Sequence, residues 1–260
     1  MKVLDLFSGI GGFSVGLEAT GMQTVAFCEP DKYCQKVLKK NWPEVPIYDD
    51  VRELTADRLL ADGIEVDVIT GGFPCQDISV AGSMWLERGG IHAERSGLWF
   101  EYARLIRELR PRYAVLENVP NLLAGDGGSW FGTILGNLAS LGYDAEWHCI
   151  PASALGAQHH RDRVFAISYP SEQGLQGSSQ ARNNGGQRQE PRHQLLTRRH
   201  RISWREWEAE PNVGRVVDGL PFRAHRIRGL GNAIVPQIAT MIGNAIKEEQ
   251  NRWTSTIQNQ

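Results

Sequence analysis

Short apolar runs alternate with amphipathic segments over the first two thirds of the chain. The apolar runs are Val3–Phe7, Thr24–Cys28, Val66–Thr70, Tyr113–Glu117 and Val164–Ser168. Segments with helical character separate them, at residues 13–20, Tyr33–Asn41, Leu98–Leu109 and Trp130–Leu141. Repeated strand–helix units of this length predict an α/β fold, with a parallel sheet covered by helices on both faces.

The alternation stops near residue 169. Residues 176–205 contain seven arginines and a single acid, Glu190, and Gly, Gln and Asn fill much of the remainder. We interpret 169–224 as a small, loop-rich insertion. The main domain then comprises 1–168 and 225–260, where helical spacing returns at 234–247. A solvated, disordered linker would have a similar composition to the insertion, so composition alone leaves its role open.

Overall composition excludes several classes of protein. The formal net charge of −2 gives no hint of a nucleic acid partner, so any such hint must come from the distribution of charge. No apolar run reaches the roughly 18 residues of a membrane helix, and the N-terminal residues lack a signal-peptide pattern. We therefore expect a cytoplasmic protein with no membrane partner. The four cysteines form no C-x-x-C pair, which disfavours a metal site.

A glycine-rich turn, Ser8 to Gly12, follows the first apolar run. Glycine lets a ligand approach the backbone, and the start of the next helix suits an anionic group. Glu29, at the end of the second run, can accept the hydroxyls of a ribose. Ser14 breaks the dinucleotide fingerprint, which disfavours a nicotinamide-dependent oxidoreductase and favours a nucleoside ligand without a pyrophosphate. Turn glycines and a surface acid are the plainer interpretation.

Two side chains with reactive chemistry lie near the ends of the third and fourth apolar runs. Cys75, in Gly72-Phe73-Pro74-Cys75-Gln76, lies in a turn where α/β folds bind ligands, so we interpret it as a nucleophile. Most free cysteines are only buried apolar residues, and we assign Cys28, Cys34 and Cys149 to that class. Glu117 ends its strand and can exchange a proton with a ring nitrogen. A surface ion pair explains Arg161 and Arg163 equally well.

Taken together, these residues point to a resemblance to a known family. The chain closely resembles the bacterial and phage DNA (cytosine-5)-methyltransferases in an ordered set of motifs: Asp5-Leu6-Phe7-Ser8-Gly9-Ile10-Gly11-Gly12-Phe13, Glu29, Asp50-Val51, Pro74-Cys75-Gln76, Glu117-Asn118-Val119, Arg161-Asp162-Arg163 and Gly231-Asn232-Ala233. The resemblance covers residues 1–168 and 225–247. His159 stands where the family usually has Gln, and the 169–224 insertion is shorter than the usual target-recognition domain.

The resemblance implies a Rossmann-like sheet that binds S-adenosylmethionine. It implies a cofactor pocket lined by Phe7, Gly9, Gly11, Glu29, Pro30, Asp50, Val51, Pro74, Leu98, Asn232 and Ile234. Glu29 would hold the ribose and Asp50 the adenine amine. The implied catalytic residues are Cys75, Glu117, Arg161 and Arg163. The 76–97 segment, with Gly82, Gly89 and Gly90, is implied to close over a flipped-out base.

The implied reaction is methyl transfer to carbon 5 of cytosine in double-stranded DNA through a covalent Cys75 adduct. We expect a monomer that acts as an orphan methylase or with a cognate restriction endonuclease. Placed where the family keeps target recognition, the arginines of the insertion, with Trp204 and Trp207, suit DNA contacts. Two alternatives stay open: the same chemistry on tRNA, and a catalytically inactive nucleic-acid-binding relative.

Overall fold

The protein folds around one seven-stranded sheet. The structure, a computed structural model, describes residues 1–74, 97–171 and 229–258, with side chains up to Arg252. The strand order is β3-β2-β1-β4-β5-β7-β6. The strands are β1 (Lys2–Leu6), β2 (Gln23–Cys28), β3 (Ile47–Tyr48), β4 (Val68–Gly71), β5 (Tyr113–Asn118), β6 (Tyr143–Pro151) and β7 (Asp162–Pro170). The α/β class expected from the alternation is confirmed.

The expectation of an all-parallel sheet is wrong at one edge. Strands β1 to β5 are parallel, but β7 runs antiparallel to both β5 and β6. The reason is the connection from β6 to β7, which contains only a short 3-10 turn, η3 (Ala152–Leu155), and no crossover helix. Strand β6 was not expected because much of it is exposed at the sheet edge, including Asp144 and Trp147. β3 has only two residues, too few for a sequence pattern.

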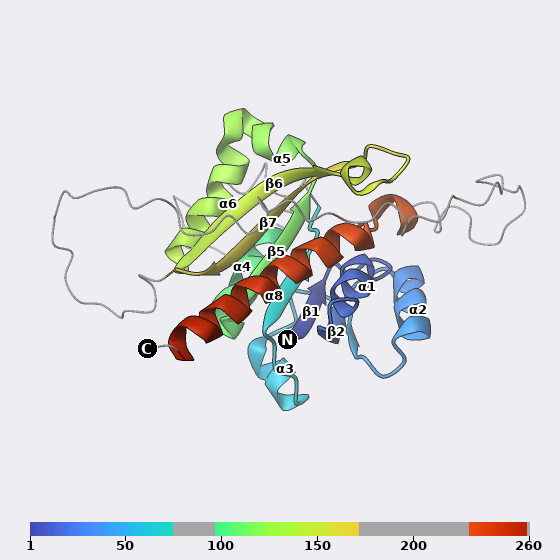
Figure 1. The fold of residues 1–260 in the computed structure, drawn as a ribbon. Helices are drawn as coiled ribbons and strands as arrows, with labels where there is room; N and C mark the ends of the chain where they lie inside the picture. Colours follow the sequence, from blue (N-terminus) through green and yellow to red (C-terminus); the bar gives the residue numbers. More distant parts are fainter. Residues whose placement is uncertain (75–96, 172–228, 259–260) are drawn as a thin grey trace, which may run out of the picture.

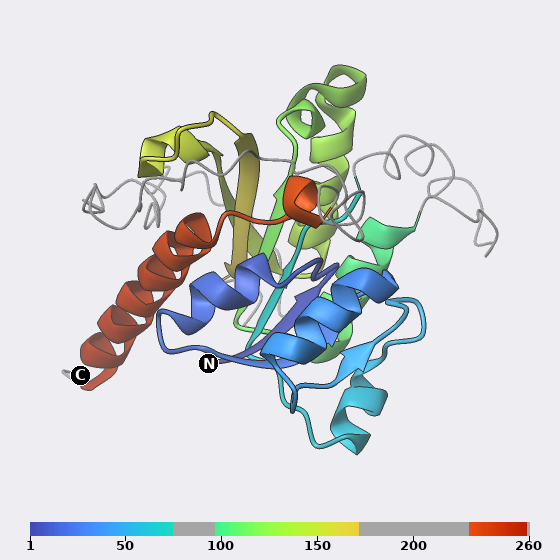
Figure 2. The ribbon, with the colours of Figure 1, turned by 90° about the vertical axis from the view of Figure 1, so that its right-hand side faces the viewer.

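Helices cover both faces of the sheet (Figures 1 and 2). The α-helices are α1 (Gly12–Glu18), α2 (Lys32–Asn41), α3 (Ala56–Ala61), α4 (Leu98–Leu109), α5 (Asn121–Ala124), α6 (Ser129–Ser140) and α8 (Pro236–Gln258), and a second 3-10 turn is η2 (Gly125–Gly128). On one face, α1 and α8 pack against Val3, Val68 and Val115. On the other, α4 and α6 pack against Leu4, Ile69 and Leu116. Alternate residues of each buried strand therefore serve two separate cores.

Side-chain caps fix where two of these helices begin. Asp31 precedes α2, and its carboxylate accepts hydrogen bonds from the N–H groups of Tyr33 at 2.8 Å and Cys34 at 3.0 Å. Thr55 precedes α3 and accepts from the N–H of Arg58 at 3.1 Å. Each cap satisfies N–H groups that have no partner within the first helical turn. Among the residues that the structure describes, no helix has the length and apolar character to cross a bilayer.

The register of the parallel strands aligns their carboxyl ends. Tyr48, Cys28, Leu6, Gly71 and Leu116 form one continuous row across β3, β2, β1, β4 and β5. The next residue on each strand therefore falls on one edge, and these residues are Asp49, Glu29, Phe7, Gly72 and Glu117. The chain order reverses between β1 and β4, which makes this edge the place where open α/β sheets bind ligands.

Candidate active site

The first half of the edge is a cradle formed by the turn after β1 and the end of β2. Glu29 is 7% exposed, and its carboxylate accepts hydrogen bonds from the N–H of Gly9 at 2.7 Å and the N–H of Asp31 at 2.8 Å. Burial raises the pKa of Glu29, and these two N–H groups oppose the rise. Each carboxylate oxygen accepts one of these bonds and keeps a lone pair for a ligand hydroxyl.

The glycine-rich turn opens a space beside Glu29. Phe7, Gly9 and Gly11 have φ angles of 51°, 55° and 89°, in the left-handed region. A Cβ on Gly9 would meet no atom within 4 Å, so the backbone here faces open space. A Cβ on Gly11 would lie 2.7 Å from the ring of Trp42, so this position requires glycine. An open backbone beside a carboxylate that can accept hydroxyl groups fits a nucleoside ligand.

A buried carboxyl on β1 links the sheet to α1, the helix that follows the glycine-rich turn. Asp5, on β1, accepts hydrogen bonds from the hydroxyls of Ser14 on α1 at 2.8 Å and Thr70 on β4 at 2.9 Å. Burial raises the pKa of Asp5 to about 7, although both hydroxyls oppose the rise. This network joins three elements at the point where the strand order reverses. Asp5 belongs to the motif Asp5-Leu6-Phe7, but its place in the sequence does not predict these two hydrogen bonds.

The segment before α8 lies against the glycine-rich turn. A Cβ on Gly12 would lie 2.4 Å from the carbonyl oxygen of Ile234, so the two backbones touch. Arg161, with a φ of 35°, donates from its guanidinium to the carbonyl oxygens of Gly231 at 2.7 Å and Ala233 at 2.6 Å. The Arg161 side chain therefore fastens the 231–234 segment. The catalytic role that the family resemblance implies for Arg161 stays a prediction.

The remaining residues predicted for the cofactor pocket differ in exposure. Asp50 is partly buried, and its carboxylate accepts a hydrogen bond from the N–H of Arg52 at 2.9 Å. Val51 packs in the core with 4% exposure. Leu98 is partly buried at the start of α4, where it packs against the core. The exposed members of the set are Pro30, Pro74 and Asn232.

The second half of the edge contains a buried ion pair. The Oε1 atom of Glu117, at the end of β5, lies 2.9 Å from Nε of Arg163 on β7. Glu117 is 8% exposed, and burial raises its pKa to about 7, while the positive charges of Arg163 and Arg161 oppose the rise. The carboxyl can therefore carry a proton near neutral pH, as a general acid must.

The end of β4 is fixed beside Glu117. A Cβ on Gly72 would lie 2.6 Å from Oε2 of Glu117, so a side chain at this position would displace the carboxylate. The amide of Asn118 donates to the carbonyl oxygen of Phe73 at 2.9 Å, and Phe73 itself is buried against Trp99. The bond from Asn118 holds Phe73, and Gly72 lies directly against the carboxylate of the ion pair. Cys75, the predicted nucleophile, lies outside the described residues.

The family assignment comes from the match to a family profile. The profile of the C-5 cytosine-specific DNA methylases matches residues 1–210. The chain belongs to this family. S-adenosylmethionine is the methyl donor of C-5 cytosine-specific DNA methylases. The family resemblance expected from the ordered motifs is confirmed.

Several bacterial members of the C-5 cytosine-specific DNA methylase family are similar to this chain. The type II methyltransferase M2.BsuMI of Bacillus subtilis is 38% identical over 172 residues, which cover 65% of this chain and 42% of that protein. The type II methyltransferase M.HhaI of Haemophilus parahaemolyticus is 30% identical over 176 residues, covering 68% and 51%. The chain thus spans about half the length of the relatives it matches.

Solved structures share the fold. A putative DNA modification methyltransferase encoded within a prophage (E. coli) matches with a TM-score of 0.55 and 27% identity, covering 65% of this chain and 47% of that one. A DNMT2 from Spodoptera frugiperda matches with a TM-score of 0.53 and 20% identity, covering 66% and 50%. The second likeness concerns the fold alone. The Rossmann-like methyltransferase sheet is therefore the architecture of this family member.

Three contacts of the site were not expected from the sequence of this C-5 cytosine-specific DNA methylase. They are the close approach of the Glu117 carboxylate to Gly72, the hydrogen bond from Asn118 to Phe73, and the hydrogen bonds from Arg161 to the 231–234 segment. The motif Glu117-Asn118 gave a partial signal, because an amide beside a strand-end acid lies at the ligand edge. The pairing of β4 with β5 was needed to connect it with Phe73.

Proposed function

We propose that this protein transfers a methyl group from S-adenosylmethionine to carbon 5 of cytosine in DNA, with Cys75 as covalent nucleophile. The observation that carries the proposal is the single edge that brings together a nucleoside cradle and a protonatable carboxyl. Glu29 and Gly9 form the cradle. Glu117 lies against Gly72, three residues before Cys75 in the chain. Methyl donor and cytosine would then meet at this edge, beyond the carboxyl ends of β1 and β4.

The cradle fits S-adenosylmethionine in its chemistry. The Glu29 carboxylate would accept the ribose hydroxyls, and the open backbone at Gly9 would admit the ligand. Asp50 would accept from the adenine amine, and Asn232 and Ile234 would close the pocket. When bound, S-adenosylmethionine supplies an electrophilic methyl group. The residues of this chain bind it, orient it and exclude water.

The cytosine half of the site would activate a poor nucleophile. The Cys75 thiolate adds to carbon 6 of the ring, and the electron pair moves toward carbon 5 and ring nitrogen 3. Glu117 donates its proton to nitrogen 3, and Arg163 orients the Glu117 carboxyl. After carbon 5 gains the methyl group, a base removes the proton of carbon 5, the Cys75 sulfur leaves carbon 6, and nitrogen 3 returns its proton to Glu117. The cytosine must first leave the duplex stack.

Replacing Glu29 by alanine is expected to weaken binding of S-adenosylmethionine by about tenfold to hundredfold, the value of one hydrogen bond to a charged group. The physical reason is the loss of the carboxylate that faces the open turn at Gly9. Isothermal calorimetry measures the affinity. The control is Glu44→Ala, which removes an exposed acid. Equal affinity of the Glu29→Ala variant and the wild type would exclude Glu29 from the cofactor site.

Double-stranded DNA is the proposed substrate. The relatives named as type II methyltransferases support this choice. The arginine-rich segment 176–205 and the rest of 172–228 lie outside the described residues, so target recognition by 169–224 stays a prediction. β7 itself continues to Pro170, two residues past the expected boundary of the main domain. A cytoplasmic monomer, with or without a partner restriction endonuclease, is part of the same proposal.

The proposed activity is tested by methyl transfer from labelled donor to duplex DNA and to tRNA in parallel. We expect label in DNA only, and bisulfite sequencing of DNA from cells expressing the protein should then show methylated cytosines at one short sequence. Label in tRNA alone would replace the proposal with the RNA alternative. Donor binding without transfer to either nucleic acid would support the inactive alternative.

A further inference from the structure

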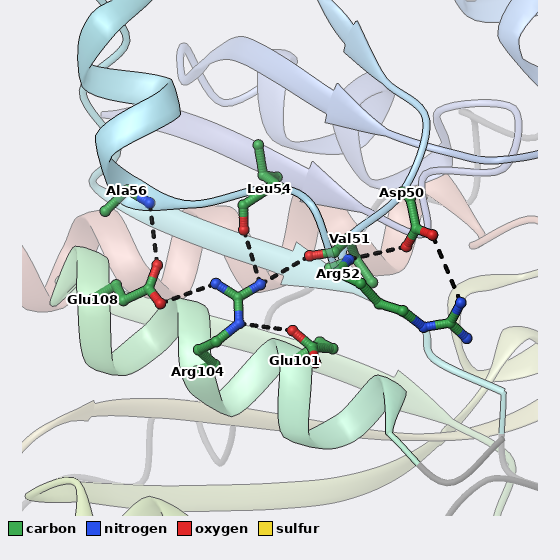
Figure 3. Close-up of polar contacts among 8 residues, drawn as sticks. All are labelled: Asp50, Val51, Arg52, Leu54, Ala56, Glu101, Arg104 and Glu108. Carbon is green, nitrogen blue, oxygen red and sulfur yellow. Dashed lines mark hydrogen bonds and ion pairs between the residues drawn. The ribbon is translucent and has the colours of Figure 1, made fainter. Parts of the chain in front are cut away.

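An arginine of α4 holds the turn that carries Asp50 and Val51. Nη2 of Arg104 donates to the carbonyl oxygens of Val51 at 2.9 Å and Leu54 at 2.8 Å (Figure 3). Both carbonyls belong to residues 50–55, which lie between β3 and α3 and outside any strand. Arg104 therefore satisfies two acceptors of this turn from a helix some fifty residues away in the chain.

Two acids of the same helix fix the guanidinium of Arg104. Its Nε lies 2.7 Å from Oε2 of Glu101, and its Nη1 lies 2.9 Å from Oε1 of Glu108. Glu108 also accepts from the N–H of Ala56, at the start of α3, at 3.1 Å. The Arg104 side chain is 20% exposed, so these pairs are partly shielded from water. These four contacts fix the orientation of the planar Arg104 guanidinium.

The same turn is held from the inside by its apolar side chains. Val51 and Leu54 are 4% and 1% exposed in the core that they share with α4. Asp50, the residue just before them, remains partly exposed, and its carboxylate is oriented by the N–H of Arg52. The position of the Asp50 carboxylate therefore depends on the path of the backbone at Val51. Arg104 fixes this path through its hydrogen bond to the carbonyl oxygen of Val51.

We propose that Arg104 is a positioning residue for binding of the methyl donor. Arg104 fixes the position of the Asp50 carboxylate, and this carboxylate recognises the adenine amine. This inference rests on the proposed function. Arg104 touches neither the donor nor the reacting atoms, and it acts through the backbone of Val51 and Leu54. A Lys in its place would keep the charge between Glu101 and Glu108, but a point charge cannot hold both carbonyls in the same fork geometry.

The test measures recognition of the adenine amine, which a merely structural role would not change. Arg104→Lys and wild type are titrated by calorimetry with S-adenosylhomocysteine and with S-inosylhomocysteine, which lacks the amine. We expect the wild type to prefer the adenosyl ligand, and the variant to lose about tenfold to hundredfold of that preference. In methyl transfer, KM for the donor should rise while kcat at saturating donor is unchanged. Arg107→Lys, on the exposed side of α4, is the matched control.

Each outcome decides the proposal. An unchanged preference in Arg104→Lys overturns it, whether or not both affinities fall together, because equal losses mean that Arg104 supports only the fold. A wild type without any preference also overturns it, because Asp50 then does not recognise the amine. A wild type that binds neither ligand removes the proposed function, and with it this inference. Thermal unfolding of each variant shows that the affinities refer to folded protein.

Discussion

Replacing Cys75 by serine is expected to abolish methyl transfer while binding of S-adenosylmethionine persists. A serine hydroxyl is far less nucleophilic than a thiolate, and loss of a covalent nucleophile costs about four orders of magnitude or more in rate. The cradle at Gly9 and Glu29 does not include Cys75, so the donor should bind as in the wild type. Transfer of labelled methyl groups to DNA and calorimetry with the donor measure the two effects separately.

The other cysteines provide the control for this prediction. Cys149 is an exposed free cysteine of β6, and Cys149→Ser should retain full activity. Cys28 and Cys34 are buried, and burial raises the pKa of each thiol to about 12, so neither supplies a thiolate at neutral pH. Normal turnover by Cys75→Ser would refute covalent catalysis by this residue.

Replacing Glu117 by glutamine is expected to lower the rate of methyl transfer about 10²-fold to 10⁴-fold, the usual contribution of a general acid. Glutamine keeps the shape of the side chain but cannot deliver a proton to the ring nitrogen. The pKa of Glu117 is raised from 4.5 to about 7, so the wild-type carboxyl is protonated below that pH and ionised above it. The wild-type kcat/KM should therefore fall as pH rises through about 7, because Glu117 loses its proton. The pH profile of Glu117→Gln should lack this falling limb.

Two measurements separate this role of Glu117 from a structural one. Removing a positive charge with Arg163→Gln should raise the pKa of Glu117 further and move the limb to higher pH, because Arg163 lies 2.9 Å away. A raised pKa also means that the wild type loses stability relative to Glu117→Gln as pH rises from 4.5 through about 7. A pH profile of kcat/KM that is identical in wild type and Glu117→Gln would exclude proton donation by Glu117.

The sequence predicted the fold where residue patterns are local. Apolar runs ending in glycine or an acid located β1, β2, β4 and β5, because a strand buried on both faces reads as a continuous apolar run. The same reasoning missed β6, whose exposed residues at the sheet edge interrupt that pattern, and the direction of β7, which depends on its pairing with β6. The direction of a strand depends on the connection to its neighbour, so the sequence of the strand alone does not determine it.

The sequence located side chains at the site better than it predicted their contacts. Glu29 and Glu117 could be placed at the edge because each directly ends an apolar run. Arg104 reads as an ordinary charged residue of an amphipathic helix, since its acceptors on the 50–55 turn are distant in the chain. Gly72 likewise reads as a turn glycine, and only the pairing of β4 with β5 shows the carboxylate that a side chain would displace.

The most direct test of covalent catalysis is a trapping experiment with the donor and duplex DNA that contains 5-fluorocytosine in place of cytosine. Fluorine at carbon 5 cannot leave as a proton does, so the bond between sulfur and carbon 6 should persist after methyl transfer. We predict a protein–DNA complex that survives denaturing electrophoresis, with the attachment mapped to Cys75 by mass spectrometry. Methylation of ordinary DNA without any trapped complex, or attachment at another residue, would contradict the mechanism.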